Sequence, residues 1–193
     1  MKRIACLAIA ITFLPFAVGI DHAKAQTVDT SSATVPASSA LTPADYNFIA
    51  QANLGAPFQV DSGRIAEEKA GTAAIRDYAH LMVTSHIPVV DALNTILKRK
   101  GLTAPPNTLL HGAYGAMIAS LKADHRGALD RDYVEGQVEY QKGNAALFQN
   151  EIRNGTDADL KEFAQKTLPK IEDHLQRALK LAKDEKLGKM ASE

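Results

Sequence analysis

Apolar residues recur at alternating steps of four and three along the stretch from Thr72 to Lys100. This spacing keeps one stripe of an α-helix turned toward a partner. The stripe consists of six apolar residues with one histidine in the middle: Ile75, Ala79, Met82, His86, Val89, Leu93 and Ile96. The pattern therefore predicts a helix that packs against other helices and carries one polar group in its buried face.

Three other stretches have similar apolar stripes, and each stripe also includes a polar residue. They run from about Pro43 to Ala70, from about Leu129 to Arg153 and from about Ala158 to Lys186. The polar residues within these stripes are Gln59, Gln141 and His174. We therefore predict four long helices whose buried faces meet, with two glutamines and two histidines converging in one layer.

Capping signals mark the ends of these helices. Thr42 and Pro43 supply an N-cap and a first-turn proline, and Thr156 or Asp157 supplies the N-cap of the last helix. Gly101 follows a run of three cations and closes the second helix. Proline removes a backbone donor inside a helix, so we expect bends at Pro57, Pro88 and Pro169.

A long segment, Gly101 to Leu129, separates the two pairs of helices. It is weakly helical between Leu109 and Ala123 and contains two prolines before that. Such a connection is typical of a crossover between two helical hairpins. We therefore predict an all-α fold for residues 42–187: a ferritin-like four-helix bundle with a long crossover containing a short helix.

The two predicted hairpins have similar sequences. Gly71-Thr72 and the following Ile75 to Ala79 match Gly155-Thr156 and the following Leu160 to Ala164 in residue type and spacing. A duplicated helical hairpin explains this similarity. Chance resemblance between two amphipathic helices is the alternative, and the sequence leaves both open.

The first 25 residues have the features of a secretory signal peptide. Lys2 and Arg3 precede an apolar run to Ile20, and a small-x-small site predicts cleavage between Ala25 and Gln26. A transmembrane anchor is the rival interpretation, but the run is short and contains Pro15. We expect a periplasmic or secreted protein with no transmembrane segment after cleavage, a flexible leader at 26–41 and a tail at 188–193.

Composition excludes several kinds of site from the predicted mature chain. The only cysteine, Cys6, lies in the signal peptide, so disulfides, thiolate metal sites and a cysteine nucleophile are excluded. Removal of residues 1–25 leaves a net charge of about −2, without a clustered basic face. Nucleic-acid binding requires such a face, so we do not expect it.

The predicted polar layer offers the main candidate chemistry. Imidazoles are good ligands for transition metals, whereas neutral amides are poor ones. His86 and His174 are therefore candidate ligands of a divalent transition metal, with Gln59 and Gln141 as neighbours. The alternative is a hydrogen-bonded polar layer that fixes helix register, as buried polar residues do in helical seams.

Other candidate residues fit simpler roles. Carboxylate-bridged di-metal bundles need Glu-x-x-His pairs, and none occurs in the sequence. The remaining candidate carboxylates, explained by a solvated helix face, are Asp61, Glu67, Glu135 and Glu139. The histidines expected at the surface are His80, His111 and His125, and the tyrosines expected to pack in the core or at its rim are Tyr78, Tyr133 and Tyr140.

Several stretches resemble the family known as domain of unknown function 4142. They include D-Y-x-F-I-A-Q-A from Asp45 to Ala52, R-D-Y-A-H-L-M-V-T-S-H from Arg76 to His86 and the run from Asp157 to Leu175. The resemblance covers about Thr42 to Ala182. It implies an exported, ferritin-like bacterial bundle, found in envelope or stress contexts and without an established activity.

The resemblance also bears on the polar layer. His86 and His174 match the family pattern. Family members commonly carry a glutamate where Gln59 stands and a histidine where Gln141 stands. If the family layer binds metal, this chain keeps two histidines and replaces two other potential ligands with amides.

Three hypotheses follow from the sequence. The first is a non-catalytic bundle that acts as a binding or envelope-stress module. The second is a bundle that binds a divalent transition metal through His86 and His174, with redox chemistry as an option. The third is an interaction module that docks an envelope protein, or a second copy of itself, between its bent helices.

Overall fold

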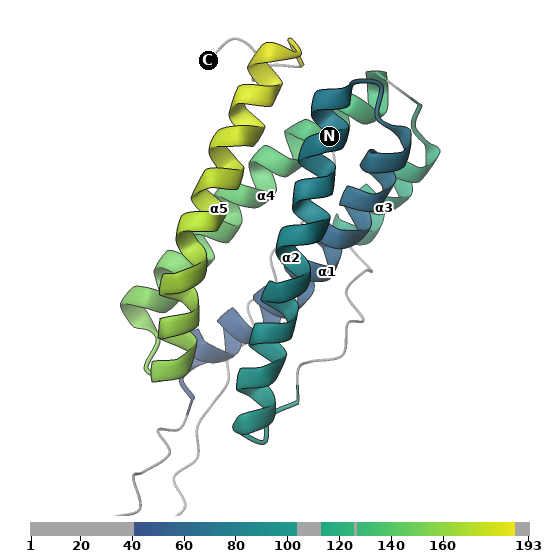
Figure 1. Cartoon of the computed structure of the whole chain (residues 1–193). Helices are drawn as coiled ribbons and strands as arrows, with labels where there is room; N and C mark the ends of the chain where they lie inside the picture. Colours follow the sequence, from purple (N-terminus) through teal and green to yellow (C-terminus); the bar gives the residue numbers. More distant parts are fainter. Residues whose placement is uncertain (1–40, 104–112, 126, 188–193) are drawn as a thin grey trace, which may run out of the picture. The chain divides into compact units, whose positions relative to one another are not determined.

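The computed structural model describes residues 41–103, 113–125 and 127–187, which contain five α-helices and no strand (Figure 1). The helices are α1 (Pro43–Lys69), α2 (Ala73–Arg99), α3 (Ala113–Ala123), α4 (Gly127–Asn154) and α5 (Ala158–Asp184). The predicted all-α fold is confirmed, as is the short helix within the crossover. The predicted signal peptide, nearly all of the leader, the tail and part of the crossover lie outside the described residues.

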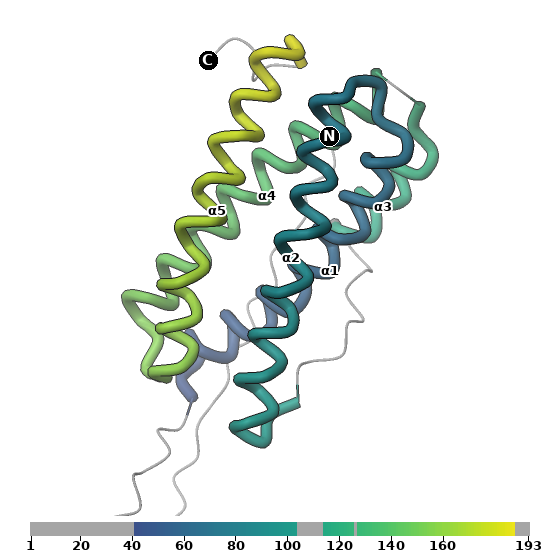
Figure 2. Tube along the Cα trace, viewed as in Figure 1, coloured from purple at the N-terminus to yellow at the C-terminus, as the bar shows by residue number. Residues whose placement is uncertain are grey.

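The four long helices are arranged as two antiparallel hairpins, α1 with α2 and α4 with α5 (Figures 1 and 2). Contacts between α1 and α4 and between α2 and α5 join the hairpins, so each long helix has two long neighbours. The short α3 packs on α1 and α4. This is the neighbour relationship that a four-helix bundle requires.

The helices begin at the capping residues that the sequence indicates. Thr42 and Asp45 form a capping box at the start of α1, in which each residue's side chain accepts from the other's backbone N–H. The Thr72 side chain accepts from Ile75 N at the start of α2. Asp157, rather than Thr156, is the N-cap of α5.

The end of α2 shows why glycine stands at position 101. Gly101 has a φ of +66°, a conformation that residues with a Cβ adopt at a cost. It allows Leu102 N to donate to Leu97 O at 2.9 Å and Gly101 N to donate to Lys98 O at 3.1 Å. This pair of hydrogen bonds stops the helix.

The three internal prolines do not end their helices. Pro57, Pro88 and Pro169 all lie inside continuous helical segments. The predicted spans of the long helices likewise place each of these prolines inside a helix and not at its end. Among the described residues, no helix combines the length and apolar character that crossing a membrane requires.

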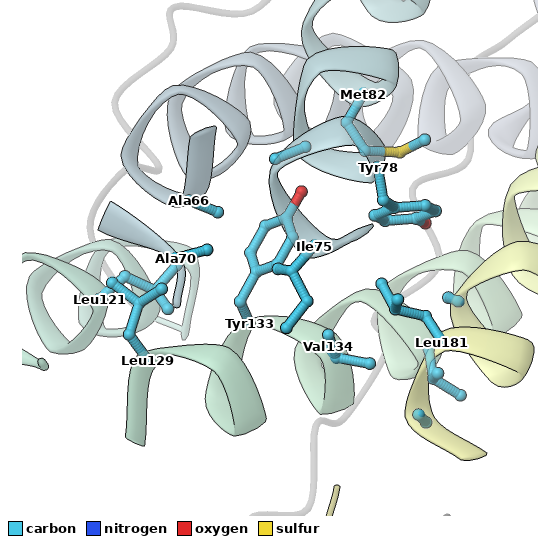
Figure 3. Packing of buried hydrophobic residues seen from close by; sticks show 14 residues of the cluster. Ala66, Ala70, Ile75, Tyr78, Met82, Leu121, Leu129, Tyr133, Val134 and Leu181 are labelled. Carbon is cyan, nitrogen blue, oxygen red and sulfur yellow. The ribbon is translucent and has the colours of Figure 1, made fainter. Parts of the chain in front are cut away.

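Two apolar clusters fill the core, one toward each end of the long helices. The first lies near the α1–α2 loop and includes Tyr78 and Tyr133, whose ring centroids are 6.3 Å apart (Figure 3). The second lies near the α4–α5 loop and is built around Phe48, Phe148 and Phe163. On every long helix, the polar residue predicted for the buried stripe falls between the residues of these two clusters.

A buried carboxylate near the start of the first helix of each hairpin holds the loop of the other hairpin. Asp45 of α1 accepts from Thr156 N in the α4–α5 loop at 3.0 Å. Asp130 of α4 accepts from Gly71 N in the α1–α2 loop at 2.8 Å. These reciprocal hydrogen bonds fasten the two hairpins to each other at both ends.

The aromatic cluster allows a test of the packing. We expect Phe48→Ala to lower the free energy of unfolding by about 3–5 kcal/mol, because the ring is 1% exposed and makes an edge contact with Phe148 at 4.9 Å. Tyr46→Ala, two residues away and 58% exposed, should change it by about 0.5 kcal/mol or less. Urea unfolding followed by circular dichroism measures both. Equal losses in the two variants would contradict this assignment of the core.

Candidate functional site

One polar side chain from each long helix is buried in the middle of the core. We call Gln59 of α1, His86 of α2, Gln141 of α4 and His174 of α5 the polar core layer. Both glutamines are fully buried, and the histidines are 4% and 6% exposed. The structure brings the two imidazoles together, with ring centroids 5.3 Å apart and ring planes tilted by 38°.

The orientation of His86 is fixed by its own helix. Its Nδ1 lies 2.9 Å from the backbone oxygen of Met82. A carbonyl oxygen only accepts, so Nδ1 carries the proton and Nε2 presents a lone pair. A backbone hydrogen bond of this kind is a common way to orient a metal-binding histidine.

His174 lacks an equivalent hydrogen bond at the corresponding nitrogen. Its Nδ1 is buried and has no hydrogen-bond partner in the described parts of the chain. Its backbone oxygen accepts from the Tyr78 hydroxyl at 3.2 Å, which ties α2 to α5 beside the layer. The backbone of His174 is therefore tied to α2, while Nδ1 of its ring has no partner in the described residues.

Both imidazoles are neutral at pH 7. Burial lowers the pKa of His86 to about 4, with a smaller contribution from His174 and an opposing one from the Met82 carbonyl. Burial likewise lowers the pKa of His174 to about 4, against the negative charge of Asp173. The neutral ring is the form that binds metal ions.

The amides of the layer are poorly hydrogen-bonded. Gln141 Nε2 donates to the Met82 sulfur at 3.5 Å, and the Gln141 side chain also forms a hydrogen bond with Tyr78. Neither side-chain atom of Gln59 has a partner among the described residues, and the same is true of the Gln141 carbonyl oxygen. Each buried polar group without a partner costs roughly 1–3 kcal/mol. A layer that only fixed register would be expected to satisfy these groups.

Two further polar residues extend the layer by one helical turn. Gln137 Nε2 donates to Ser62 Oγ at 3.5 Å, and Ser62 Oγ donates to the backbone oxygen of Gln59 at 3.4 Å. Both side chains are fully buried. Neither residue was predicted as part of the layer, although the spacing offered a signal. Gln137 lies four residues before Gln141, and Ser62 three after Gln59, so each shares a helix face with a predicted member of the layer.

The separation of the two imidazoles matches that of two rings on one metal ion. A ring bound at ~2.0–2.1 Å has its centroid roughly 3.2 Å from the metal, so two rings at a tetrahedral angle have centroids roughly 5.2 Å apart. The observed separation is 5.3 Å. Across the described residues, no group of three or more His, Cys, Asp or Glu side chains is placed to hold a metal. Any further ligands must therefore be amide oxygens, a thioether or water.

The other candidate residues lie apart from the layer. His80 is exposed, with Nδ1 2.9 Å from Glu67 Oε1, and His125 is exposed as predicted. Tyr78 and Tyr133 are buried in the core as predicted. The candidate carboxylates Asp61, Glu67, Glu135 and Glu139 are all partly or fully exposed, and His111 lies outside the described residues.

Surface cavities lie along the described helices, and two of them border aromatic residues of the core. The larger, of about 610 Å³, is lined by residues of α1, α3 and α4, including Phe58, Tyr114 and Tyr140. The smaller, of about 400 Å³, lies between α2 and α5 and is lined partly by Tyr78. Tyr78 also donates to the backbone oxygen of His174, so this cavity borders the α2–α5 contact beside the layer.

Comparison with known proteins supports the family expected from the sequence. A solved structure of a DUF305 fragment from Deinococcus radiodurans is similar in fold, with a TM-score of 0.62 and 13% sequence identity, over 72% of this chain and 94% of that one. No curated protein matches the chain. The family model described as "Domain of unknown function (DUF4142)" matches residues 30–181. The chain therefore belongs to the DUF4142 family.

Proposed function

We propose that this protein is an exported, non-catalytic helical bundle that binds a divalent transition-metal ion between His86 and His174. The observation that carries the proposal is the pair of neutral imidazoles, with centroids 5.3 Å apart, within a layer that contains unpartnered polar atoms. Export is supported by the basic residues, apolar run and small-x-small site of the first 25 residues.

The chemistry of the layer restricts the metals that it would bind. Two imidazoles with amide and thioether neighbours suit Zn²⁺, Cu²⁺, Ni²⁺ or Co²⁺ rather than Mg²⁺ or Ca²⁺, which require several charged or carbonyl oxygens. Nε2 of His86 is one ligand, because its Nδ1 is occupied by the Met82 carbonyl. Nδ1 of His174, which has no other partner, is the second.

The same features support a binding role rather than a catalytic one. None of the four layer residues is a carboxylate, cysteine or lysine. The lowered pKa values of both imidazoles keep them neutral, so they would be weak proton acceptors at neutral pH. A metal in this layer would stabilise the folded protein and satisfy its unpartnered polar atoms.

The proposal predicts opposite effects of one substitution on stability and on binding. In metal-free protein, His174→Leu should raise the free energy of unfolding by about 1–2 kcal/mol, because it removes a buried polar atom without a partner. It should also weaken Zn²⁺ binding at least ~100-fold, because one of only two imidazole ligands is lost. Calorimetric titration and urea unfolding of tag-free protein measure the two effects.

His80→Leu is the matched control, since His80 is an exposed histidine elsewhere on the same bundle. It should leave Zn²⁺ affinity within about twofold of the wild-type value. The proposal is wrong if the wild type takes up no stoichiometric Zn²⁺, Cu²⁺, Ni²⁺ or Co²⁺, or if His174→Leu binds as tightly as the wild type.

The pH dependence of binding offers a second test. Protons compete with metal only near and below the pKa of the ligands, which is about 4 for both imidazoles. Affinity should therefore stay nearly constant from pH 7.5 to pH 5.5 and fall as the pH approaches 4. Titrations in a weakly coordinating buffer test this directly. A fall of tenfold or more between pH 7 and pH 6 would indicate ligands with the ordinary imidazole pKa of about 6.5.

A further inference from the structure

A second group of buried polar side chains lies at the opposite end of the bundle from the α1–α2 loop. Asp45, in the first turn of α1, is fully buried. Its carboxylate accepts five hydrogen bonds: two from Thr42, two from Thr156 and one from Asp157 N. Burial acts to raise the pKa of Asp45, but these hydrogen bonds outweigh it and lower the pKa well below its usual range. Asp45 therefore carries a negative charge at neutral and mildly acidic pH.

Glu151, near the end of α4, is the neighbour of this anion. It is fully buried, and no donor among the described residues forms a hydrogen bond with either of its carboxyl oxygens. Gly155 makes room for it, because a Cβ at that position would collide with Glu151 Oε1. An ionised Glu151 has no donor in the part of the chain that the structure describes, whereas a protonated Glu151 has the Asp45 carboxylate as an acceptor.

The charges around Glu151 favour its protonated form. Burial raises the pKa of Glu151 to about 7, and hydrogen bonding to Asp45 and the charges of Asp45 and Asp157 act in the same direction. Lys161 of α5 opposes them. Lys100, at the end of α2, is paired with Asp157 and Asp159 at 2.8 Å and so compensates those carboxylates.

We propose that Glu151 and Asp45 share a proton in a carboxylic acid–carboxylate hydrogen bond that fastens α1 to the α4–α5 junction. In this pair the Glu151 O–H donates to Asp45. When Glu151 ionises, the hydrogen bond is replaced by repulsion between two buried carboxylates. The junction that this pair fastens consists of the first turn of α1, the end of α4 and the N-cap of α5.

Folding raises the pKa of Glu151, and this sets the sign of its effect on the pH dependence of stability. The folded protein holds the Glu151 proton to a pH of about 7, whereas an unfolded glutamate loses it near 4.5. Folded protein therefore binds more protons between these two values, and its stability falls as the pH rises through them. The two core histidines contribute with the opposite sign between about 4 and 6.5. The contribution of Glu151 must therefore be isolated by comparison with a variant.

Glu151→Gln provides that comparison, because glutamine is neutral and its amide can donate to Asp45 at every pH. We expect the ratio of its folding equilibrium constant to that of the wild type to grow roughly 50- to 100-fold between pH 5 and pH 8. Urea unfolding at each pH measures this ratio. The control, Glu172→Gln, changes an exposed glutamate on α5 and should give a constant ratio. A constant ratio for Glu151→Gln as well would overturn the proposal.

Wild-type protein provides an independent readout that does not depend on a variant folding. The carboxyl carbon of Glu151, followed by ¹³C NMR, should titrate with a midpoint near pH 7, whereas a midpoint near 4.5 would overturn the proposal. Hydrogen-exchange protection at the amides of Thr156 and Asp157, which donate to Asp45, should fall between pH 5 and pH 8. Unchanged protection across this range would contradict release of the junction.

Discussion

Burial of four polar side chains in one layer of an apolar core is the constraint on which this structure depends. Each long helix contributes one, and the apolar clusters on either side keep bulk water out. The layer is energetically unfavourable while its amide and imidazole atoms lack partners. A ligand that satisfies them would add stability to the folded bundle.

Buried carboxylates lie at both ends of the bundle. Asp45 and Asp130 are buried, and each satisfies backbone donors in a loop of the other hairpin. Five donors stabilise the charge of Asp45, whereas no donor among the described residues stabilises a charge on the neighbouring Glu151. The same end of the bundle thus contains one permanent anion and one group whose ionisation state depends on pH. Neither group belongs to the polar core layer.

The periodicity of the sequence predicted the long helices and the polar residue in each buried stripe, because helix geometry repeats locally along the chain. Pairing of His86 with His174 followed from the expected helix arrangement. The role of Glu151 could not be predicted in this way, because it depends on Asp45, which is over one hundred residues away and meets it only in the folded chain. The same distant residue bears on the cap of α5: the Thr156 hydroxyl donates to Asp45, and the Asp157 side chain accepts from Asp159 N and Leu160 N.

The most direct test of the metal-binding account is long-range ¹H–¹⁵N NMR of the histidine rings during a titration with Zn²⁺. Before metal is added, both core imidazoles should be neutral at pH 7, with the proton of His86 on Nδ1. One equivalent of Zn²⁺ should shift Nε2 of His86 and one ring nitrogen of His174 together, with the exposed histidines unchanged. The account is contradicted if the core rings are protonated at pH 7, or if only the exposed histidines respond.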